Sequence, residues 1–308
     1  MTQVTVVMST YNGEAFLREQ LDSILAQEGV NVKLYVRDDG SRDGTVQMLE
    51  QYDDQYDNFV FWNRGRVENL GIKRSFLGLL HDALCAEPGC AYFAFADQDD
   101  FWQPNKLAAG VAMLQTVENT GDARALYYSN KTFVDVQLKL ISQEHIRYYG
   151  DFLEACYGCL ASGCTMVMSR ALAQTATEAI PEIDCIHDAW VYRLAKATGA
   201  RIVFDEKSHI LYRQHGNNVC GVDACVPSLN RWQNLFRRRE HPIQRFMQEI
   251  SLLHGNLLAG EEKKYVENLC AYNHSLKATL ALACSPLAKK RGWKTQCLWI
   301  AKVVFRTL

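Results

Sequence analysis

The first hundred residues alternate between short apolar runs and segments with helical periodicity. Four runs rich in β-branched and aromatic residues lie at 4–8, 32–36, 59–62 and 91–96. After the first run, "EAFLREQLDSILAQ" places its apolar residues at helical spacing. Strands that are apolar throughout and separated by helices are typical of parallel sheets covered on both faces. The sequence therefore predicts an α/β fold with a mostly parallel, Rossmann-like sheet flanked by helices.

A polar cluster follows three of these apolar runs. The clusters are "STYNGE" at 9–14, "RDDGSRDGT" at 37–45 and "DQDD" at 97–100. In a parallel sheet the carboxyl ends of the strands share one edge, and ligands bind beyond that edge. We therefore expect three pieces of sequence that lie far apart along the chain to meet in one crevice.

Composition and charge argue against several classes of protein. The 308 residues include 33 Lys and Arg against 35 Asp and Glu, so no overall positive field favours a nucleic acid partner. Neither GxxxxGK[ST] nor GxGxxG follows the first apolar run, which disfavours a P-loop kinase or a dinucleotide dehydrogenase. The start has no basic leader, and no run approaches the roughly 20 apolar residues that cross a bilayer. We expect neither a signal peptide nor a membrane span.

The cysteines indicate a reducing compartment rather than a disulfide framework. Eleven of them occur without a repeating pattern. Cys156, Cys159 and Cys164 begin with a zinc-like spacing, but no second Cys or His pair stands at finger distance. We interpret these three residues as buried or half-buried thiols.

The Asp-x-Asp at 97–99 is the main candidate for a metal site. Mg²⁺ and Mn²⁺ take oxygen ligands, and they commonly bind one or two carboxylates together with substrate phosphates. Asp97 and Asp99 follow a buried run and precede a helix, so their carboxylates are expected to face the crevice. In the alternative interpretation, Asp99 or Asp100 caps the helix that Pro104 opens, and the other acids are solvated.

Three further segments supply candidate groups. The side chains of "STYNGE", and Asp38 with Asp39, suit the base and ribose of a nucleotide, although turns and helix caps use the same residues. Asp188, at the start of a helical pattern, is a candidate general base or a partner of the helix dipole. His215, in a polar loop, is a candidate metal ligand or phosphate donor.

Six segments stand in order within about the first 220 residues: "VVMSTYNGEAFLREQLDSILAQ", "VRDDGSRDGT", "NLGIKRSF", "FADQDDFWQPNKL", "HDAW" and "YRQHGNNVCG". Together they resemble the family 2 glycosyltransferases of the GT-A fold, and within them the bacterial rhamnosyltransferase-like branch. The resemblance implies an inverting, metal-dependent transfer of L-rhamnose from dTDP-L-rhamnose to an acceptor hydroxyl. It also implies a place in the biosynthesis of cell-surface polysaccharide such as O-antigen or capsule.

The resemblance, carried over motif by motif, assigns roles to individual residues. Asp97 and Asp99 would be the family's Asp-x-Asp, binding Mn²⁺ or Mg²⁺, with Asp97 nearer the ribose. Asp188 would be the catalytic base, and His187 stands where many relatives have Glu. The remaining assignments are Thr10, Tyr11, Asn12 and Glu14 to the nucleoside pocket, Asp38 and Asp39 to the base, Lys73 to the ribose or diphosphate, His215 to the metal, and Arg213 to the phosphates.

The resemblance does not cover the C-terminal part of the chain. Helical patterns without strand signals predict a helical region at 226–308 behind a catalytic domain at 1–225. "RWQNLFRRRE" and "KKRGWKTQCLWIAKVVFRTL" join aromatic to basic residues, which suits either a helix on an anionic membrane surface or a hairpin packed on the catalytic domain. We expect a cytoplasmic enzyme, peripheral to the inner membrane if its saccharide acceptor is lipid-linked.

Other functions stay open at this point. A UDP-sugar-dependent glucosyl- or galactosyltransferase of the same family is one, because nothing in the sequence identifies the sugar ring. A nucleotidyltransferase is another, although a Gly-rich, basic loop is expected where this chain has "STYNGE". A non-catalytic module that binds nucleotide sugars is disfavoured by the presence of Asp97, Asp99, Asp188 and His215.

Overall fold

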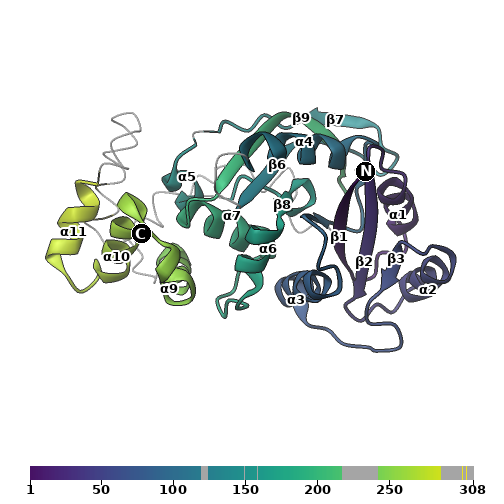
Figure 1. Ribbon diagram of the computed structural model, residues 1–308, viewed down its shortest axis with the longest axis horizontal. Coiled ribbons are helices and arrows are strands. Elements are labelled where there is room, and N and C mark those ends of the chain that lie inside the picture. The colour runs from purple at the N-terminus through teal and green to yellow at the C-terminus, as the bar shows by residue number, and fades with distance from the viewer. Residues whose placement is uncertain are drawn as a thin grey trace.

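The computed structural model describes residues 1–118, 124–148, 150–157, 159–216, 242–285, 300 and 303, and these residues form a nine-stranded sheet flanked by helices (Figure 1). The strands are β1 Thr2–Thr10, β2 Val30–Asp38, β3 Phe59–Phe61, β4 Tyr92–Ala96, β5 Phe101–Trp102, β6 Ala125–Val134, β7 Leu140–Gln143, β8 Val167–Ser169 and β9 Arg201–Arg213. The described helices are α1 Leu17–Leu25, α2 Thr45–Gln55, α3 Gly71–Ala86, α4 Lys106–Glu118, α5 Phe152–Tyr157, α6 Arg170–Thr177, α7 His187–Ala197, α9 Pro242–His254, α10 Gly260–Ala271 and α11 Leu276–Ala283, with 3₁₀ turns η1 Gly163–Thr165 and η3 Gly255–Leu257.

The first four strands form a parallel half-sheet in the order β3-β2-β1-β4. Thr10, the last residue of β1, pairs with Asp38 of β2, and Met8 pairs with Ala96 at the end of β4. The three strands therefore finish at the same edge, and the polar clusters that follow them begin side by side. This arrangement confirms the convergence expected from the sequence.

The second half of the sheet mixes directions. β8 runs antiparallel to both β4 and β6, whereas the long β9 is parallel to β6 and antiparallel to the short β5. β7 joins the edge of β6 as an antiparallel hairpin. The α/β class with helices on both faces is confirmed, and the antiparallel strands are the part that the apolar runs did not indicate.

Alternating residues of β1 pack on different helices. Val4, Val6 and Met8 belong to one buried apolar cluster with residues of α1, α2 and α4. Val7 belongs to a second cluster with residues of α3, α6 and α7. Burial of a Val or Met side chain stabilises a fold by about 1.5–3 kcal/mol. The sheet is thus held between two apolar layers, and its polar edge is left for a ligand.

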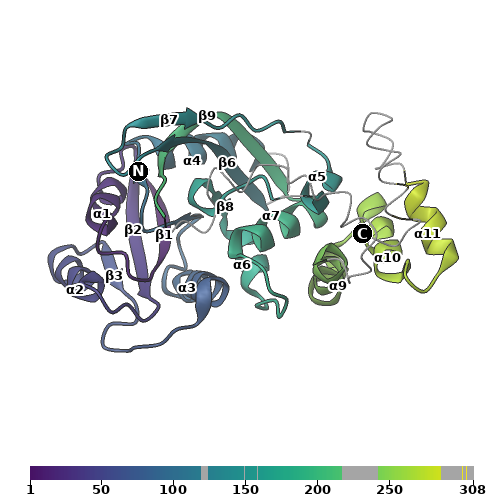
Figure 2. The same cartoon turned by 180° about the vertical axis from the view of Figure 1, so that it is seen from behind.

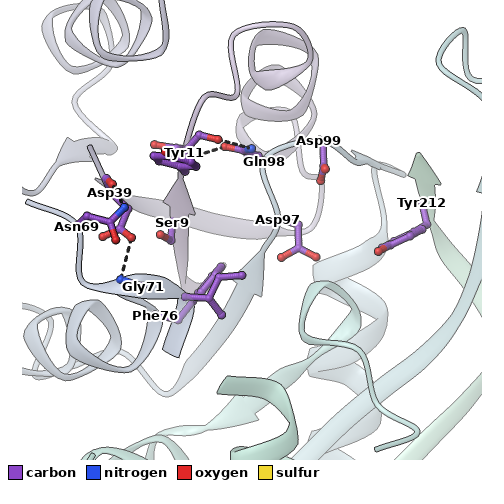
Figure 3. Close-up of a pocket in the computed structure, with 12 residues that line it drawn as sticks. Ser9, Tyr11, Asp39, Asn69, Gly71, Phe76, Asp97, Gln98, Asp99 and Tyr212 are labelled. Atoms are coloured by element: carbon purple, nitrogen blue, oxygen red, sulfur yellow. Dashed lines mark hydrogen bonds between the residues drawn. The ribbon is translucent and has the colours of Figure 1, made fainter. Parts of the chain in front are cut away.

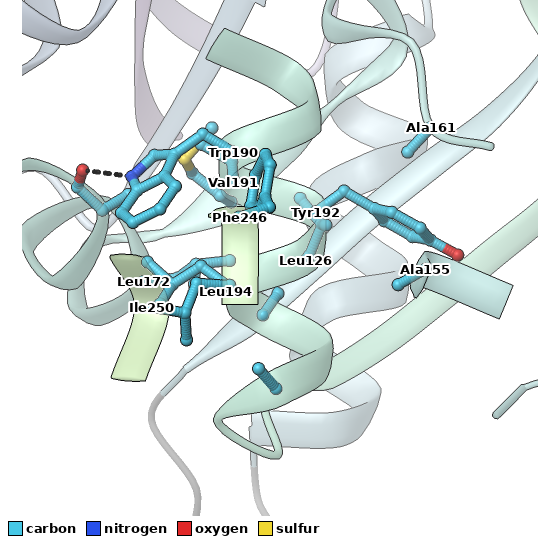
Figure 4. Packing of buried hydrophobic residues seen from close by; sticks show 14 of the residues in the cluster. Leu126, Ala155, Ala161, Leu172, Trp190, Val191, Tyr192, Leu194, Phe246 and Ile250 are labelled. Atoms are coloured by element: carbon cyan, nitrogen blue, oxygen red, sulfur yellow. Dashed lines mark hydrogen bonds between the residues drawn. The ribbon is translucent and has the colours of Figure 1, made fainter. Parts of the chain in front are cut away.

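The described C-terminal helices pack on the α/β part of the chain through α7. Phe246 and Ile250 of α9 lie beside Trp190 and Leu194 of α7 (Figure 4). The Trp190 and Phe246 rings have their centroids 5.6 Å apart. Figure 2, seen from behind, shows α9, α10 and α11 at the opposite end of the molecule from α2. The described C-terminal helices therefore share an apolar cluster with α7.

Several expectations for the C-terminal part fall outside the described residues. "RWQNLFRRRE" lies wholly outside them, as does almost all of "KKRGWKTQCLWIAKVVFRTL". The proposed boundary between 225 and 226 also lies there, so the domain division stays a prediction. Among the described residues, no helix is both long and apolar enough to span a bilayer.

Candidate active site

A pocket of about 360 Å³ opens at the polar edge of the sheet (Figure 3). Its floor comes from the ends of β1 and β4, and its walls come from the start of α3 and the end of β9. In Figure 3, Asp39 and Tyr11 lie toward one end of the pocket, and Asp97 and Asp99 lie toward the other. The lining residues are Ser9, Thr10, Tyr11, Asp39, Asn69, Gly71, Ile72, Phe76, Asp97, Gln98, Asp99 and Tyr212.

Tyr11 and Asp39 form an end that suits a flat heterocyclic base. Half of the Tyr11 side chain is exposed, and its backbone is fixed because its N–H donates to Gln98 Oε1 at 2.8 Å. The Asp39 carboxylate accepts hydrogen bonds from the N–H groups of Leu70 and Gly71 at 2.7 and 2.9 Å. An exposed aromatic ring beside an oriented carboxylate offers both stacking and a hydrogen-bond acceptor.

Asp38, the neighbour of Asp39, is turned inward. Its carboxylate accepts hydrogen bonds from the N–H groups of Gly40 and Ser41 at 3.0 and 2.8 Å and from the Thr10 hydroxyl at 3.1 Å. Asp38 is 4% exposed and does not line the pocket. The structure therefore separates the two acids, because one shapes the turn after β2 and the other faces the pocket.

Asn12 and Glu14 connect two loops. Asn12 Oδ1 accepts a hydrogen bond from the N–H of Arg42 at 2.9 Å, and Glu14 Oε2 accepts one from the N–H of Gly44 at 2.8 Å. We call the full set of bonds between the β1–α1 and β2–α2 loops the loop clasp; its residues are Asn12, Gly13, Glu14, Ser41, Arg42, Asp43, Gly44 and Thr45. The structure thus places Asn12 and Glu14 beside the pocket, with their oxygens engaged in the clasp.

Lys73 and Arg213 point away from the pocket lining. Lys73 Nζ donates to the carbonyl oxygen of Ile183. Arg213 is 1% exposed; its Nε donates to the Asp99 carbonyl oxygen at 3.0 Å and its Nη1 to the Val136 carbonyl oxygen at 2.5 Å. Its guanidinium also pairs with Glu19 at 2.5 Å. Arg213 therefore fixes the backbone of the loop that carries Asp99.

Asp97, Asp99 and His215 form the acidic end of the site. His215 Nε2 lies 2.8 Å from Asp99 Oδ2, and both acids line the pocket. Burial raises the pKa of Asp97 to about 7, with further contributions from the charges of Asp99 and Asp188. Negative charge that a site cannot stabilise alone favours a bound cation. Two carboxylates and an imidazole are donors that suit Mn²⁺ or Mg²⁺, so these residues fit such an ion.

A second set of potential metal-ligand atoms adjoins the acidic end of the site and shares Asp97 with it. Atoms of Asp97, Asp100 and Cys164 lie within 4.8 Å of one another. Burial raises the pKa of both Asp100 and Cys164 well above their usual range, which disfavours the deprotonated forms that bind metals. Asp100 Oδ1 accepts a bond from the Arg213 N–H at 3.3 Å and Oδ2 has no partner, so Asp100 does not cap the helix after Pro104.

Cys156, Cys159 and Cys164 are buried or half-buried. Among the residues that the structure describes, the set with converging ligand atoms includes Cys164 but neither Cys156 nor Cys159. Cys156 is buried, and the half-buried Cys159 thiol donates to the Ala161 carbonyl oxygen at 3.1 Å. The interpretation as buried or half-buried thiols is confirmed.

Asp188, the candidate base, is hydrogen-bonded to a glycine next to the acidic end of the site. Its Oδ2 accepts a hydrogen bond from the N–H of Gly163 at 3.0 Å. The preceding residue, His187, stacks on Phe76 with ring centroids 3.8 Å apart, and Phe76 lines the pocket. Asp188 raises the pKa of Asp97, so the candidate base lies within electrostatic range of the acids.

The pocket also involves residues that the motifs did not single out by themselves: Ser9, Phe76 and Tyr212 lie within the quoted segments, whereas Lys131 lies outside all six. Ser9, Phe76 and Tyr212 line the pocket, and Lys131 of β6 contributes a buried positive charge that lowers the pKa of Asp97. Phe76 and Tyr212 carry only the apolar signal of a helix or strand, which core residues share. Lys131 is a charged residue of β6 that is buried like its neighbours in the strand. A charge within a strand was the one signal available in the sequence.

A pocket at the carboxyl ends of parallel strands, with an acidic loop beside it, is the place where open α/β sheets bind their ligands. The family described as Glycosyl transferase family 2 matches residues 5–176, and the chain belongs to this family. The dTDP-rhamnosyl transferase RfbG of Shigella flexneri is 28% identical over 307 residues, which covers 94% of this chain and 97% of that protein. An uncharacterized glycosyltransferase of Rickettsia typhi is 31% identical over 118 residues, covering 38% of this chain and 33% of that protein.

The fold itself resembles that of a solved glycosyltransferase. Residues 1–349 of S. aureus TarS, in complex with UDP-GlcNAc, superpose with a TM-score of 0.59 at 18% identity, covering 99% of this chain and 80% of that one. The expected GT-A fold is thus confirmed, and the protein is a glycosyltransferase.

Proposed function

We propose that this protein transfers L-rhamnose from dTDP-L-rhamnose to a saccharide hydroxyl with inversion, in the assembly of a bacterial surface polysaccharide. One observation carries the proposal: Tyr11 with Asp39, and Asp97 with Asp99, line one pocket of about 360 Å³ and lie toward different sides of it (Figure 3). That spacing matches a donor with a base at one end and a diphosphate at the other. The donor sugar rests on the full-length similarity to a dTDP-rhamnosyl transferase.

The acidic end suits the diphosphate only with a divalent cation. Asp97, Asp99 and His215 would hold Mn²⁺ or Mg²⁺, which would supply positive charge for the phosphate oxygens. Tyr11 and Asp39 would bind and orient the base. We do not assign Lys73 or Arg213 to the diphosphate, because Lys73 donates to the Ile183 carbonyl oxygen and Arg213 to the Asp99 carbonyl oxygen.

Asp188 would act as the general base. In a single displacement, the acceptor oxygen forms a bond to the anomeric carbon as the bond to the diphosphate oxygen breaks, and the acceptor proton passes to a carboxylate. The Gly163 N–H fixes one Asp188 oxygen at 3.0 Å, which holds the carboxylate in a defined orientation. Phe76, stacked on His187, would close the pocket on that side.

A donor screen tests this function. The purified chain is incubated with dTDP-L-rhamnose, UDP-glucose or UDP-galactose, and nucleotide diphosphate release is measured with Mn²⁺ and with EDTA. We expect release from dTDP-L-rhamnose only, lost with EDTA and restored by Mn²⁺. Faster turnover of a UDP-sugar would overturn the donor, and full activity in EDTA would overturn the metal dependence.

Two variants and one control test the residues. Asp188→Asn is expected to lower turnover by about 10²–10⁴-fold because the base is removed. Asp99→Asn is expected to weaken Mn²⁺-dependent activity while dTDP binding is retained. Asp57→Asn changes an exposed acid far from the pocket and serves as the control. Near-normal turnover by the Asp188 variant would contradict the assignment of the base.

A further inference from the structure

Lys131 is a buried cation between the pocket and the candidate base. It lies on β6, is 8% exposed, and its Nζ donates a hydrogen bond to Ser162 Oγ at 2.7 Å. The ammonium also lies 4.7 Å from the ring centroid of Tyr212, which lines the pocket. Lys131 itself lies outside the six segments that resemble the family.

Ser162 leads directly to Asp188. The Ser162 carbonyl oxygen accepts hydrogen bonds from Thr165, through the backbone N–H at 2.9 Å and the hydroxyl at 2.8 Å, which closes the η1 turn. The next residue, Gly163, donates its N–H to Asp188 Oδ2. Lys131 therefore anchors the first residue of the turn whose second residue holds the candidate base.

Glu144 is the second partner of the Lys131 ammonium. Glu144 Oε1 lies 3.5 Å from Lys131 Nζ, and Glu144 Oε2 accepts a hydrogen bond from the Lys131 backbone N–H at 3.2 Å. A buried ammonium held by two polar partners has little freedom to move. Its position, and so the position of Ser162, is determined by the β6–β7 hairpin.

We infer that Lys131 is a positioning residue for the glycosyl transfer, acting through Ser162 and Gly163 on the carboxylate of Asp188. The inference rests on the proposed function of Asp188 as the base. It does not depend on which nucleotide sugar is the donor. A displacement of a reacting group by about 1 Å can lower a rate by as much as 10²-fold, so a change at Lys131 should reach the chemistry without touching the donor.

Donor hydrolysis with water as the acceptor provides the assay. The donor is whichever nucleotide sugar the unaltered protein turns over, so a failed donor proposal is seen in the unaltered protein first. For Lys131→Met we expect kcat to fall by about tenfold or more. With Mn²⁺ at a saturating concentration, the donor KM and the Kd of the nucleoside diphosphate should stay within about twofold, because Tyr11 and Asp39 are unchanged and the lost charge acts on Asp97 through its pKa. Lys139→Met, at an exposed turn residue, is the matched control and should behave as the unaltered protein.

Two more variants separate positioning from stability. Removing one partner of a buried ion pair destabilises a fold, whereas removing both is often tolerated. The double variant Lys131→Met/Glu144→Gln should therefore recover the Tm that Lys131→Met loses, yet keep its low kcat. Ser162→Ala keeps the charge and should reproduce most of the loss in kcat. Recovery of kcat in the double variant, or an unaltered rate for Ser162→Ala, would overturn the inference.

Discussion

Replacing His187 with Phe should remove a pH-dependent loss of stability. The imidazole is 4% exposed, stacks on Phe76 at 3.8 Å and meets the edge of Phe95 at 4.6 Å. Neither ring nitrogen has a hydrogen-bond partner. A ring buried this way is stable only when neutral, because protonation would place an unpaired charge in an apolar layer. Phe can take the same stacked position and does not titrate.

The size and sign of the effect follow from linkage. An unfolded chain protonates its histidines near pH 6.5, whereas burial lowers the pKa of His187 to about 4, against the opposing charge of Asp188. The unfolded chain therefore binds the proton first, so stability is complete above pH 6.5 and is lost as the pH falls toward 4. The free energy of unfolding should fall by about 2 kcal/mol between pH 7.5 and 5.0, and by about 3 kcal/mol in all.

Urea unfolding of the unaltered protein and of His187→Phe at pH 7.5 and 5.0 measures this contribution of His187 to the free energy of unfolding. Asp97 has a raised pKa of about 7, so its contribution runs the other way and increases stability as the pH falls from 7. Because Asp97 is present in both proteins, it cancels in the comparison. Any cost of fitting the larger ring is the same at both pH values. A difference between the two proteins that stays constant within about 0.5 kcal/mol would refute the reasoning.

Two substitutions test the supports of the site. Gly163→Ala should lower kcat of donor hydrolysis by about tenfold, because the added Cβ would lie 2.6 Å from His187 Nε2 and 3.3 Å from Asp188 Cβ. Gly89→Ala, whose Cβ would meet nothing within 4 Å, is its control, and equal rates for the two would contradict the prediction. Arg213→Lys should lower the free energy of unfolding by about 2–3 kcal/mol, because an ammonium cannot reproduce a planar fork bound to Asp99, Val136 and Glu19. Thermal unfolding against the exposed Arg201→Lys measures this, and an unchanged Tm would show that those contacts contribute nothing.

The first four strands were predictable because each is apolar throughout and ends in a polar cluster. β5, β7 and β8 were not, since they have two to four residues and their pairing depends on strands distant in sequence. The helix after β4 begins at Lys106, two residues beyond the Pro104 that predicted it. Short antiparallel strands are set by tertiary pairing rather than by a local pattern.

The candidate site, like the fold, was predictable from the sequence only in part. The edge that Asp39, Asp97 and Asp99 share followed from strand order, and the structure places all three on one pocket. Which of two adjacent acids faces a ligand is decided by a turn, so the sequence could not separate Asp38 from Asp39. Lys131 and Gly163 act through contacts with residues about 25 to 30 positions away, and a local pattern carries no trace of such contacts.

The loop clasp has a consequence for directed evolution of donor preference. Substitutions at Asn12 or Glu14 would release two loops at once, so a library there would mostly contain poorly folded variants. Residues 64–70 are exposed throughout, and Asn69 from this segment lines the pocket. The Asp39 carboxylate binds the backbone N–H groups of Leu70 and Gly71, which any side chain there but proline would preserve. Randomising 66, 67, 69 and 70 therefore varies the Tyr11–Asp39 end of the pocket, with Gly65, whose φ is 78°, and the ion-paired Arg64 and Glu68 kept.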